Sequence, residues 1–286
     1  MGGISGMKCV ITGASGYVGS CIARYLAGKG FDIIEAGRSG SIRFSLGDKV
    51  DKRAFEAMDA LVHCAYDFRP KAWEDIRRVN VLGSIEVLRA AKEAGVKKII
   101  VLSSMSAFPG CASDYGRAKL EIEAEAKKMG AYIIRPGLVY GKSPRSVVGK
   151  MRSFLERYPI IPLMDTGKGK LYLCHNEDLA ELIRSICTSK AIPPVVPITA
   201  AHEQGFTFKE MIEVMASSSG KKARFLPMPN LLLSFGLRAA ELAGLNQGIR
   251  SDSFSSLLNL DPHPDFGQTR KSGVIFREFS VETMDQ

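Results

Sequence analysis

Short apolar runs alternate with longer amphipathic stretches along the first half of the chain. The apolar runs end at glycine or polar residues and predict buried strands at 9–12, 31–36, 42–46, 60–64, 98–103 and 131–135. The amphipathic stretches predict helices at 17–26, 53–58, 73–94 and 114–129. Strands that alternate with helices favour a parallel sheet covered on both faces. The pattern therefore predicts an α/β protein with a doubly wound parallel sheet.

The pattern changes beyond Gly141. Helices are predicted at 147–157, 177–187 and 207–219, and they are separated by proline-rich connections at 192–194 and 227–229. We interpret 7–141 as one domain, to which elements from about 171–200 return, and 142–286 mainly as a smaller carboxyl-terminal lobe. The tail after about Asp261 is polar, and we expect it to be loosely held.

Three glycines follow the first apolar run at intervals of three. Gly13 allows a sharp turn, Gly16 lets a pyrophosphate approach the backbone, and Gly19 lets the following helix pack closely. Phosphates then lie at the positive end of that helix. We predict a dinucleotide site, and a glycine-rich turn without a ligand is the alternative. The predicted contacts of the turn are Gly13, Ser15, Gly16, Tyr17, Val18 and Gly19.

The residues after the next strands indicate which dinucleotide binds. Where a fold that prefers NAD places an acidic residue, this chain has Arg38 and Ser39, and an arginine there suits the 2′-phosphate of NADP. We therefore predict NADP, with NAD as the alternative. Asp48 either holds the adenine amino group or caps its own loop. Ala65 is small where a cofactor needs room.

Composition excludes several classes of protein. The 286 residues are 45% hydrophobic, with a mean hydropathy of +0.01 and no apolar stretch long enough to span a bilayer. The net charge of +9 is dispersed over the chain, so we expect no nucleic-acid partner. Six cysteines without CxxC spacing indicate neither a metal site nor a disulfide framework. We expect a cytoplasmic protein without a membrane partner.

Two further polar residues lie in predicted elements of the first half. His63 has apolar neighbours in a strand, so we interpret it as a structural histidine. Asn80 is interpreted as a bridge between backbone groups near the site, with a surface amide as the alternative.

Tyr115 and Lys119 are one helical turn apart, so both side chains project from one face of the helix. The phenol acts as an acid or base near neutral pH when its pKa falls by roughly 3 units, and we expect the neighbouring ammonium to supply much of that shift. Ser104 follows the fifth strand, at the sheet edge where ligands bind. Its hydroxyl would hydrogen-bond the oxygen of a substrate, or else serve only as a turn residue.

Together these motifs resemble the extended short-chain dehydrogenase/reductase family, in its NAD-dependent epimerase/dehydratase-like branch. The similar segments are 12–19, 62–65, 80–83, 103–104, 115–119, 135–141 and 175–180. The resemblance implies a Rossmann fold and the catalytic triad Ser104, Tyr115 and Lys119, with Lys119 also on the nicotinamide ribose. It further implies that the segment with Pro136, Leu138 and Val139 lies against the nicotinamide.

We therefore expect an NAD(P)-dependent oxidoreductase or epimerase that transfers hydride at a carbinol or ketone carbon. A nucleotide sugar is the favoured substrate, and Arg145, Lys150 and Arg152 either meet its diphosphate or form a solvated helix face. The alternative is a non-catalytic NADP-binding redox sensor or assembly subunit. The long helices 73–94 and 114–129 are candidates for a homodimer interface, unless their apolar faces serve the monomer's own core.

Overall fold

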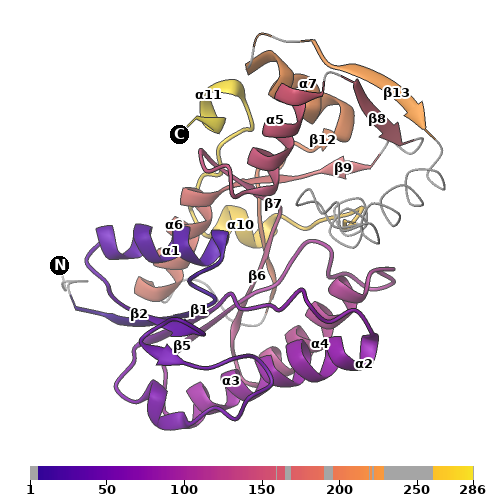
Figure 1. Cartoon of the computed structure of the whole chain (residues 1–286). Coiled ribbons are helices and arrows are strands. Elements are labelled where there is room, and N and C mark those ends of the chain that lie inside the picture. Colours follow the sequence, from indigo (N-terminus) through magenta and orange to yellow (C-terminus); the bar gives the residue numbers. More distant parts are fainter. Residues whose placement is uncertain are drawn as a thin grey trace.

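The computed structural model describes residues 6–158, 160–164, 169–189, 196–218, 220, 222–228 and 260–285. Its centre is a seven-stranded parallel sheet in the order β11-β6-β5-β4-β1-β2-β3 (Figure 1). The strands are β1 (Lys8–Thr12), β2 (Asp32–Gly37), β3 (Ile42–Arg43), β4 (Ala60–His63), β5 (Lys98–Leu102), β6 (Tyr132–Pro136) and β11 (Ile198–Ala200). The predicted doubly wound parallel sheet is confirmed.

Helices cover both faces of this sheet, as Figure 1 shows. One face carries α1 (Tyr17–Gly28) and α6 (Asn176–Thr188), and the other carries α2 (Trp73–Ile76), α3 (Gly83–Glu93) and α4 (Asp114–Lys128). Strand β1 serves both layers, because Cys9 and Ile11 belong to one apolar cluster and Val10 to the other. Its residues are apolar on both faces for this reason.

A second lobe contains short strand pairs and further helices. The pairs are β7 (Leu138–Tyr140) with β10 (Leu173–His175), β9 (Lys170–Leu171) with β12 (Phe206–Thr207), and β8 (Ile160–Met164) with β13 (Arg224–Met228). The helices are α5 (Val147–Arg157), α7 (Phe208–Ser218) and α11 (Val281–Met284), whereas α10 (Gly267–Lys271) packs on β11 of the large sheet. Tyr140 is fully buried in a third apolar cluster there. The predicted proline-rich connection at 192–194 lies outside the described residues.

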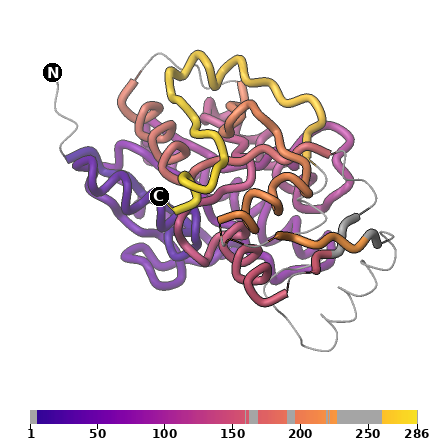
Figure 2. The backbone as a smooth tube through the Cα atoms, turned by 90° about the horizontal axis from the view of Figure 1, so that it is seen from above, coloured from indigo at the N-terminus to yellow at the C-terminus, as the bar shows by residue number. Residues whose placement is uncertain are grey.

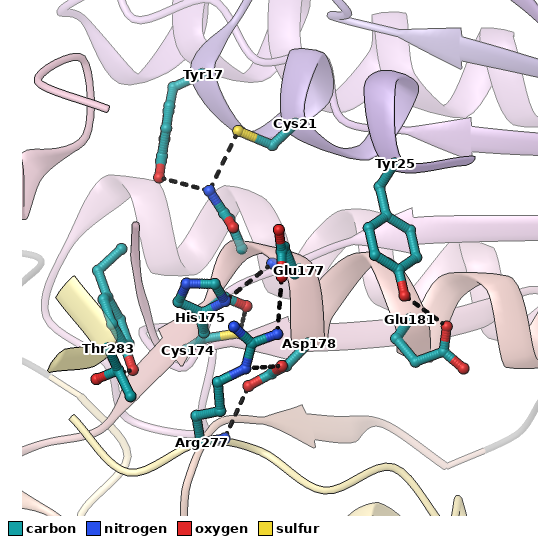
Figure 3. A network of polar contacts seen from close by, with 12 residues as sticks. Tyr17, Cys21, Tyr25, Cys174, His175, Glu177, Asp178, Glu181, Arg277 and Thr283 are labelled. Atoms are coloured by element: carbon teal, nitrogen blue, oxygen red, sulfur yellow. Dashed lines mark hydrogen bonds and ion pairs between the residues drawn. The ribbon is translucent and has the colours of Figure 1, made fainter. Parts of the chain in front are cut away.

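Helix α6 joins the two halves of the chain. Figure 3 shows its contact with α1, where Tyr25 donates a hydrogen bond to Glu181 over 2.9 Å. The Asn176 amide also donates to the Tyr17 phenol oxygen over 3.3 Å. Strand β11, which follows α6, then pairs with β6 at the edge of the large sheet. Helix α6 and strand β11 thus pack on the framework of the first half.

The tail after Asp261 is firmly packed, so the expectation of a loosely held tail is wrong. Three buried aromatic residues lie among its polar residues: Phe266, Phe276 and Phe279. Arg277 forms ion pairs with both Glu177 and Asp178 at 2.9 Å, which Figure 3 shows at the start of α6. In Figure 2 the tail, in yellow, crosses the face seen from above. A few buried aromatic side chains and the ion pairs of Arg277 hold the tail in place, although most of its residues are polar.

Two local elements differ from the sequence prediction. The third strand ends at Arg43 rather than Leu46, because the chain from Phe44 to Leu46 leaves β2 and lines a pocket. The helix predicted over 53–58 is the single 3₁₀ turn η1 (Lys52–Phe55). The predicted helix 73–94 is observed, but its middle is the π-helical segment η2 (Arg77–Leu82), which contains the buried Asn80.

Candidate active site

A pocket of about 640 Å³ lies at the carboxyl ends of the central strands, where ligands bind in open parallel sheets. Fourteen of the sixteen predicted site residues line it, and Ser39 and Asp48 are not among its lining. The lining residues from the prediction are Gly13, Ser15, Gly16, Tyr17, Val18, Gly19, Arg38, Ala65, Ser104, Tyr115, Lys119, Pro136, Leu138 and Val139. Segments spread over most of the first half therefore converge on one pocket.

The glycine turn tolerates no side chains at its two critical positions. Gly13 has φ +70°, and a Cβ there would lie 2.9 Å from the backbone of Ala65. A Cβ on Gly19 would overlap the carbonyl oxygen of Gly13. Gly16 is the N-cap of α1, so the first turn of that helix presents its N–H groups and positive dipole end to the pocket. This cradle fits the diphosphate of a dinucleotide.

The pocket continues past the end of β2. Arg38 lines it there together with Phe44 and Leu46. The Asp48 carboxylate accepts a hydrogen bond from the Ser45 N–H over 3.1 Å, which is the loop-capping arrangement rather than an outward-facing ligand contact. A cationic group and two apolar side chains thus surround this part of the pocket.

Tyr115, Lys119 and Ser104 meet in another part of the pocket. Tyr115 lies in the first turn of α4, which Ser113 caps by accepting a hydrogen bond from the Gly116 N–H. Ser104 hydrogen-bonds the Tyr115 phenol, and the Ser104 oxygen also accepts from the Ser106 N–H over 3.1 Å. Lys119 is buried, and its Nζ donates to the Leu102 carbonyl oxygen over 2.7 Å. The three residues form one polar group at the end of β5.

Burial dominates the protonation of this group. It raises the pKa of Tyr115 to about 12, although the hydrogen bond from Ser104 acts in the opposite direction. The expected lowering of this pKa by Lys119 is therefore wrong for the protein alone. Burial also lowers the pKa of Lys119 to about 8, and that buried ammonium lies 5.8 Å from the centre of the Tyr115 ring. At neutral pH the phenol keeps its proton.

Sequence reasoning missed Glu123, which fixes the position of α4. Glu123 is 1% exposed, and its carboxylate accepts hydrogen bonds from Arg135 Nε and Nη2 over 2.8 and 2.7 Å. It also accepts from the Ser103 hydroxyl over 2.6 Å. Because Tyr115, Lys119 and Glu123 are four residues apart, they share one face of α4. That i, i+4, i+8 spacing is the sequence signal that could have revealed it.

The loop after β4 was also missed, apart from Ala65. Asn80 holds it by accepting from the Asp67 N–H over 2.6 Å and donating to the Asp67 carbonyl oxygen over 2.9 Å. The interpretation of Asn80 as a backbone bridge near the site is confirmed. On either side of Asp67, the rings of Tyr66 and Phe68 both contact the ring of Tyr115.

A comparison with known protein families identifies the chain. The profile of the family described as "NAD dependent epimerase/dehydratase family" matches residues 9–196, which span the large sheet and the pocket. The chain belongs to the NAD dependent epimerase/dehydratase family. It is accordingly an NAD-dependent enzyme with a Rossmann fold.

Two curated relatives illustrate the range of this epimerase/dehydratase family. The chain is 25% identical over 276 residues to a ceramide reductase of Caulobacter vibrioides, covering 91% of this chain and 82% of the relative. It is also 25% identical over 258 residues to a UDP-glucose 4-epimerase of Vibrio cholerae, covering 77% and 78%. Both similarities extend well beyond the glycine turn.

A solved structure agrees with the observed fold. MoeE5 in complex with UDP-glucuronic acid and NAD has a TM-score of 0.67 and 17% sequence identity, over 96% of this chain and 98% of that one. At this identity the likeness concerns the fold alone.

Other polar groups of this family member serve the structure. His63 is buried and bonded on both ring nitrogens, to Thr12 at 2.8 Å and to Ser84 at 2.9 Å, so its interpretation as a structural histidine is confirmed. Across the residues placed by the structure, no group of three or more His, Cys, Asp or Glu is arranged to hold a metal ion. Within the same residues, no helix combines the length and apolar character needed to cross a bilayer.

Proposed function

We propose that the protein is an NADP-preferring oxidoreductase that acts on a ketone or secondary alcohol through Ser104, Tyr115 and Lys119. The observation that supports this most directly is that these three polar groups line the same pocket as the glycine turn. The fold-level similarity to an NAD complex is consistent with the cofactor class. A bound nicotinamide dinucleotide supplies or accepts the hydride.

The protonation of Tyr115 suits the role of general acid in reduction. Its pKa of about 12 keeps the phenol protonated at neutral pH, so it is ready to donate a proton. In reduction the carbonyl carbon gains a hydride, the carbonyl π bond breaks, and the oxygen takes the Tyr115 proton. Ser104 orients that oxygen by a hydrogen bond, and the Lys119 ammonium stabilises the phenolate left behind. Oxidation followed by reduction on the other face would give epimerisation by the same groups.

Arg38 supports the preference for NADP. It lines the pocket just after β2, and a guanidinium binds a phosphate bidentately with charge-assisted hydrogen bonds. The turn residues and Pro136, Leu138 and Val139 would hold the remainder of the dinucleotide.

Two substrate classes are candidates. The relative that acts as a UDP-glucose 4-epimerase supports a nucleotide sugar, and Arg145 lines the pocket where a phosphate could be met. Arg152 supports it less, because it pairs with Asp285 at 2.6 Å. The ceramide reductase relative supports a carbonyl compound with a large apolar part, and the aromatic rings beside Tyr115 favour that class.

The test compares wild type with Tyr115→Phe. Oxidation of NADPH with a panel of ketones, and binding of NADPH measured separately, distinguish an enzyme from a protein that only binds the dinucleotide. We expect the variant to bind NADPH and to lose at least about 100-fold in kcat, the range that general acid catalysis contributes. Equal turnover by both forms would reject the role of Tyr115 and favour a redox sensor or assembly subunit.

A further inference from the structure

We propose that the substrate carries its reacting carbonyl on a flat apolar ring system that packs against Phe68. This inference rests on the proposed function, because it takes Tyr115 as the group that meets the carbonyl oxygen. It makes Phe68 a specificity-determining residue and favours an aromatic or polycyclic ketone over a nucleotide sugar.

The first observation is an aromatic wall, formed by Tyr66 and Phe68, around the Tyr115 ring. The Phe68 ring is stacked on that of Tyr115, with centroids 5.8 Å apart and an interplanar angle of 24°. The Tyr66 ring meets Tyr115 edge-on at 4.9 Å and Phe68 at 4.8 Å. Aromatic rings at these separations attract one another beyond the area that they bury. A flat substrate ring next to the phenol would extend the same arrangement.

Phe68 combines a fixed backbone with an accessible side chain. It is 51% exposed and lines the pocket, whereas most large apolar side chains of the sheet domain are buried. The preceding residue, Asp67, is held through both its backbone groups by the buried Asn80. The loop therefore presents an apolar surface at the pocket in a defined place, and packing a substrate ring on Phe68 removes that surface from water.

Two arginines that line the pocket are already engaged by other groups of the protein. Arg69, the nearest cation in the sequence, is paired with Asp67 at 2.6 Å. Arg145 donates to the carbonyl oxygen of Ser15 over 2.7 Å and so is engaged with the glycine turn. The lining contributed by the segment after β6 and the start of α5 includes the apolar Leu138, Val139 and Val147. These apolar side chains suit contact with a flat ring.

The experiment uses the full chain and three probes: 1-tetralone as a flat bicyclic ketone, 2-octanone as an acyclic apolar ketone, and UDP-glucose. Reduction of the ketones is followed with NADPH, and oxidation or epimerisation of UDP-glucose with NADP or NAD. We expect the highest kcat/KM for 1-tetralone. Phe68→Ala should lower that value about 10-fold, mainly through KM, because a stacked aromatic pair contributes this much.

Two variants separate the role of the ring from general damage. Phe68→Tyr keeps a stacking ring and should remain within about twofold of wild type. Phe154→Ala removes another partly exposed aromatic side chain, on α5 and outside the pocket lining, and should leave 1-tetralone kinetics unchanged. The effect of Phe68→Ala on 2-octanone should be smaller than on 1-tetralone.

The proposal is overturned if UDP-glucose is the better substrate, or if Phe68→Ala affects 1-tetralone and 2-octanone equally. It is also overturned if 1-tetralone is not reduced in the presence of NADPH and is not bound by the NADP-loaded protein in a direct titration. Tyr115→Phe reports on the proposed function independently. Full turnover in that variant would reject the catalytic role whatever Phe68 does, and loss of turnover together with an indifferent Phe68 would reject only the substrate class.

Discussion

Arg135 at the end of β6 donates two hydrogen bonds, of 2.8 and 2.7 Å, to the buried carboxylate of Glu123 on α4. The same carboxylate accepts a hydrogen bond from the hydroxyl of Ser103, the residue before Ser104. A single side chain therefore fixes the helix that carries Tyr115 against two strands of the sheet. Glu123 therefore acts by holding the proposed catalytic groups in position.

Glu123→Gln should strongly destabilise the protein. The change leaves the half-buried guanidinium of Arg135 without its counter-charge, and breaking a buried ion pair costs about 3–5 kcal/mol. Urea unfolding measures the change. Glu125→Gln on the same helix is the control, because its pair with Lys128 is largely exposed and contributes less than about 1 kcal/mol. Similar losses in both variants would contradict the special position of Glu123.

Arg38→Ala should convert the preference between the two dinucleotides. Loss of a bidentate contact with the 2′-phosphate should weaken NADP binding roughly 10- to 100-fold and NAD binding little. Dissociation constants for both cofactors provide the measurement. Arg43→Ala removes an exposed arginine close in sequence that does not line the pocket, and it controls for the change in net charge. Parallel weakening of NAD and NADP would argue against the phosphate contact.

The rate of ketone reduction should fall as the pH rises above about 8. Lys119 has a pKa of about 8, so its ammonium is lost through this range, whereas Tyr115 with a pKa of about 12 stays protonated. A pH profile of kcat with saturating NADPH measures this decrease, which forms the alkaline limb of the profile. Lys119→Arg keeps its charge over the whole range and should remove the limb, even if its maximal rate is lower. A limb near 8 that persists in this variant would assign it to another group.

His63 should make the protein sensitive to acid. Burial, with a smaller contribution from the charge of Lys119, lowers its pKa to about 3, below the value of about 6.5 for an unfolded histidine. The unfolded state therefore binds the proton first, and stability is lost as the pH falls from about 6.5 toward 3. Between pH 7 and 5 this amounts to about 2 kcal/mol.

Urea unfolding at several pH values tests the role of His63. His63→Gln should be less stable at pH 7 but should lose less stability between pH 7 and 5. His263→Gln, at an exposed position, is the matched control. An unchanged pH dependence in His63→Gln would mean that other groups cause the acid sensitivity.

The sheet and the glycine turn could be predicted because their signals are local. Gly13 and Gly19 are required by contacts within a few residues and by one neighbouring strand, and Tyr115 and Lys119 are related by a single helical turn. The apolar runs specify the strands, and their alternation with helices specifies the parallel sheet. Such features leave the same pattern in any chain that forms them.

The missed features depend on residues that are distant in sequence. The bridging role of Asn80 could be predicted, but the hydrophobic pattern does not distinguish the π-helical segment that carries it from an α-helix. The pKa of Tyr115 depends on how deeply the pocket buries it, which a sequence does not reveal. In the tail, Phe266 and Phe276 are too irregularly spaced to form a recognisable amphipathic pattern.

The packed tail also means that the fold cannot be completed until synthesis on the ribosome is nearly finished. The Asp261 N–H bonds to Met105, Thr269 bonds to Thr199, and Arg277 reaches back to Asp178, so segments made early wait for partners made late. Translation at about 5–20 residues per second delays those partners by many seconds. In that interval the nascent chain contains the strands of the sheet but lacks the tail that packs on them. A chaperone that holds the incomplete chain would be most useful during this time.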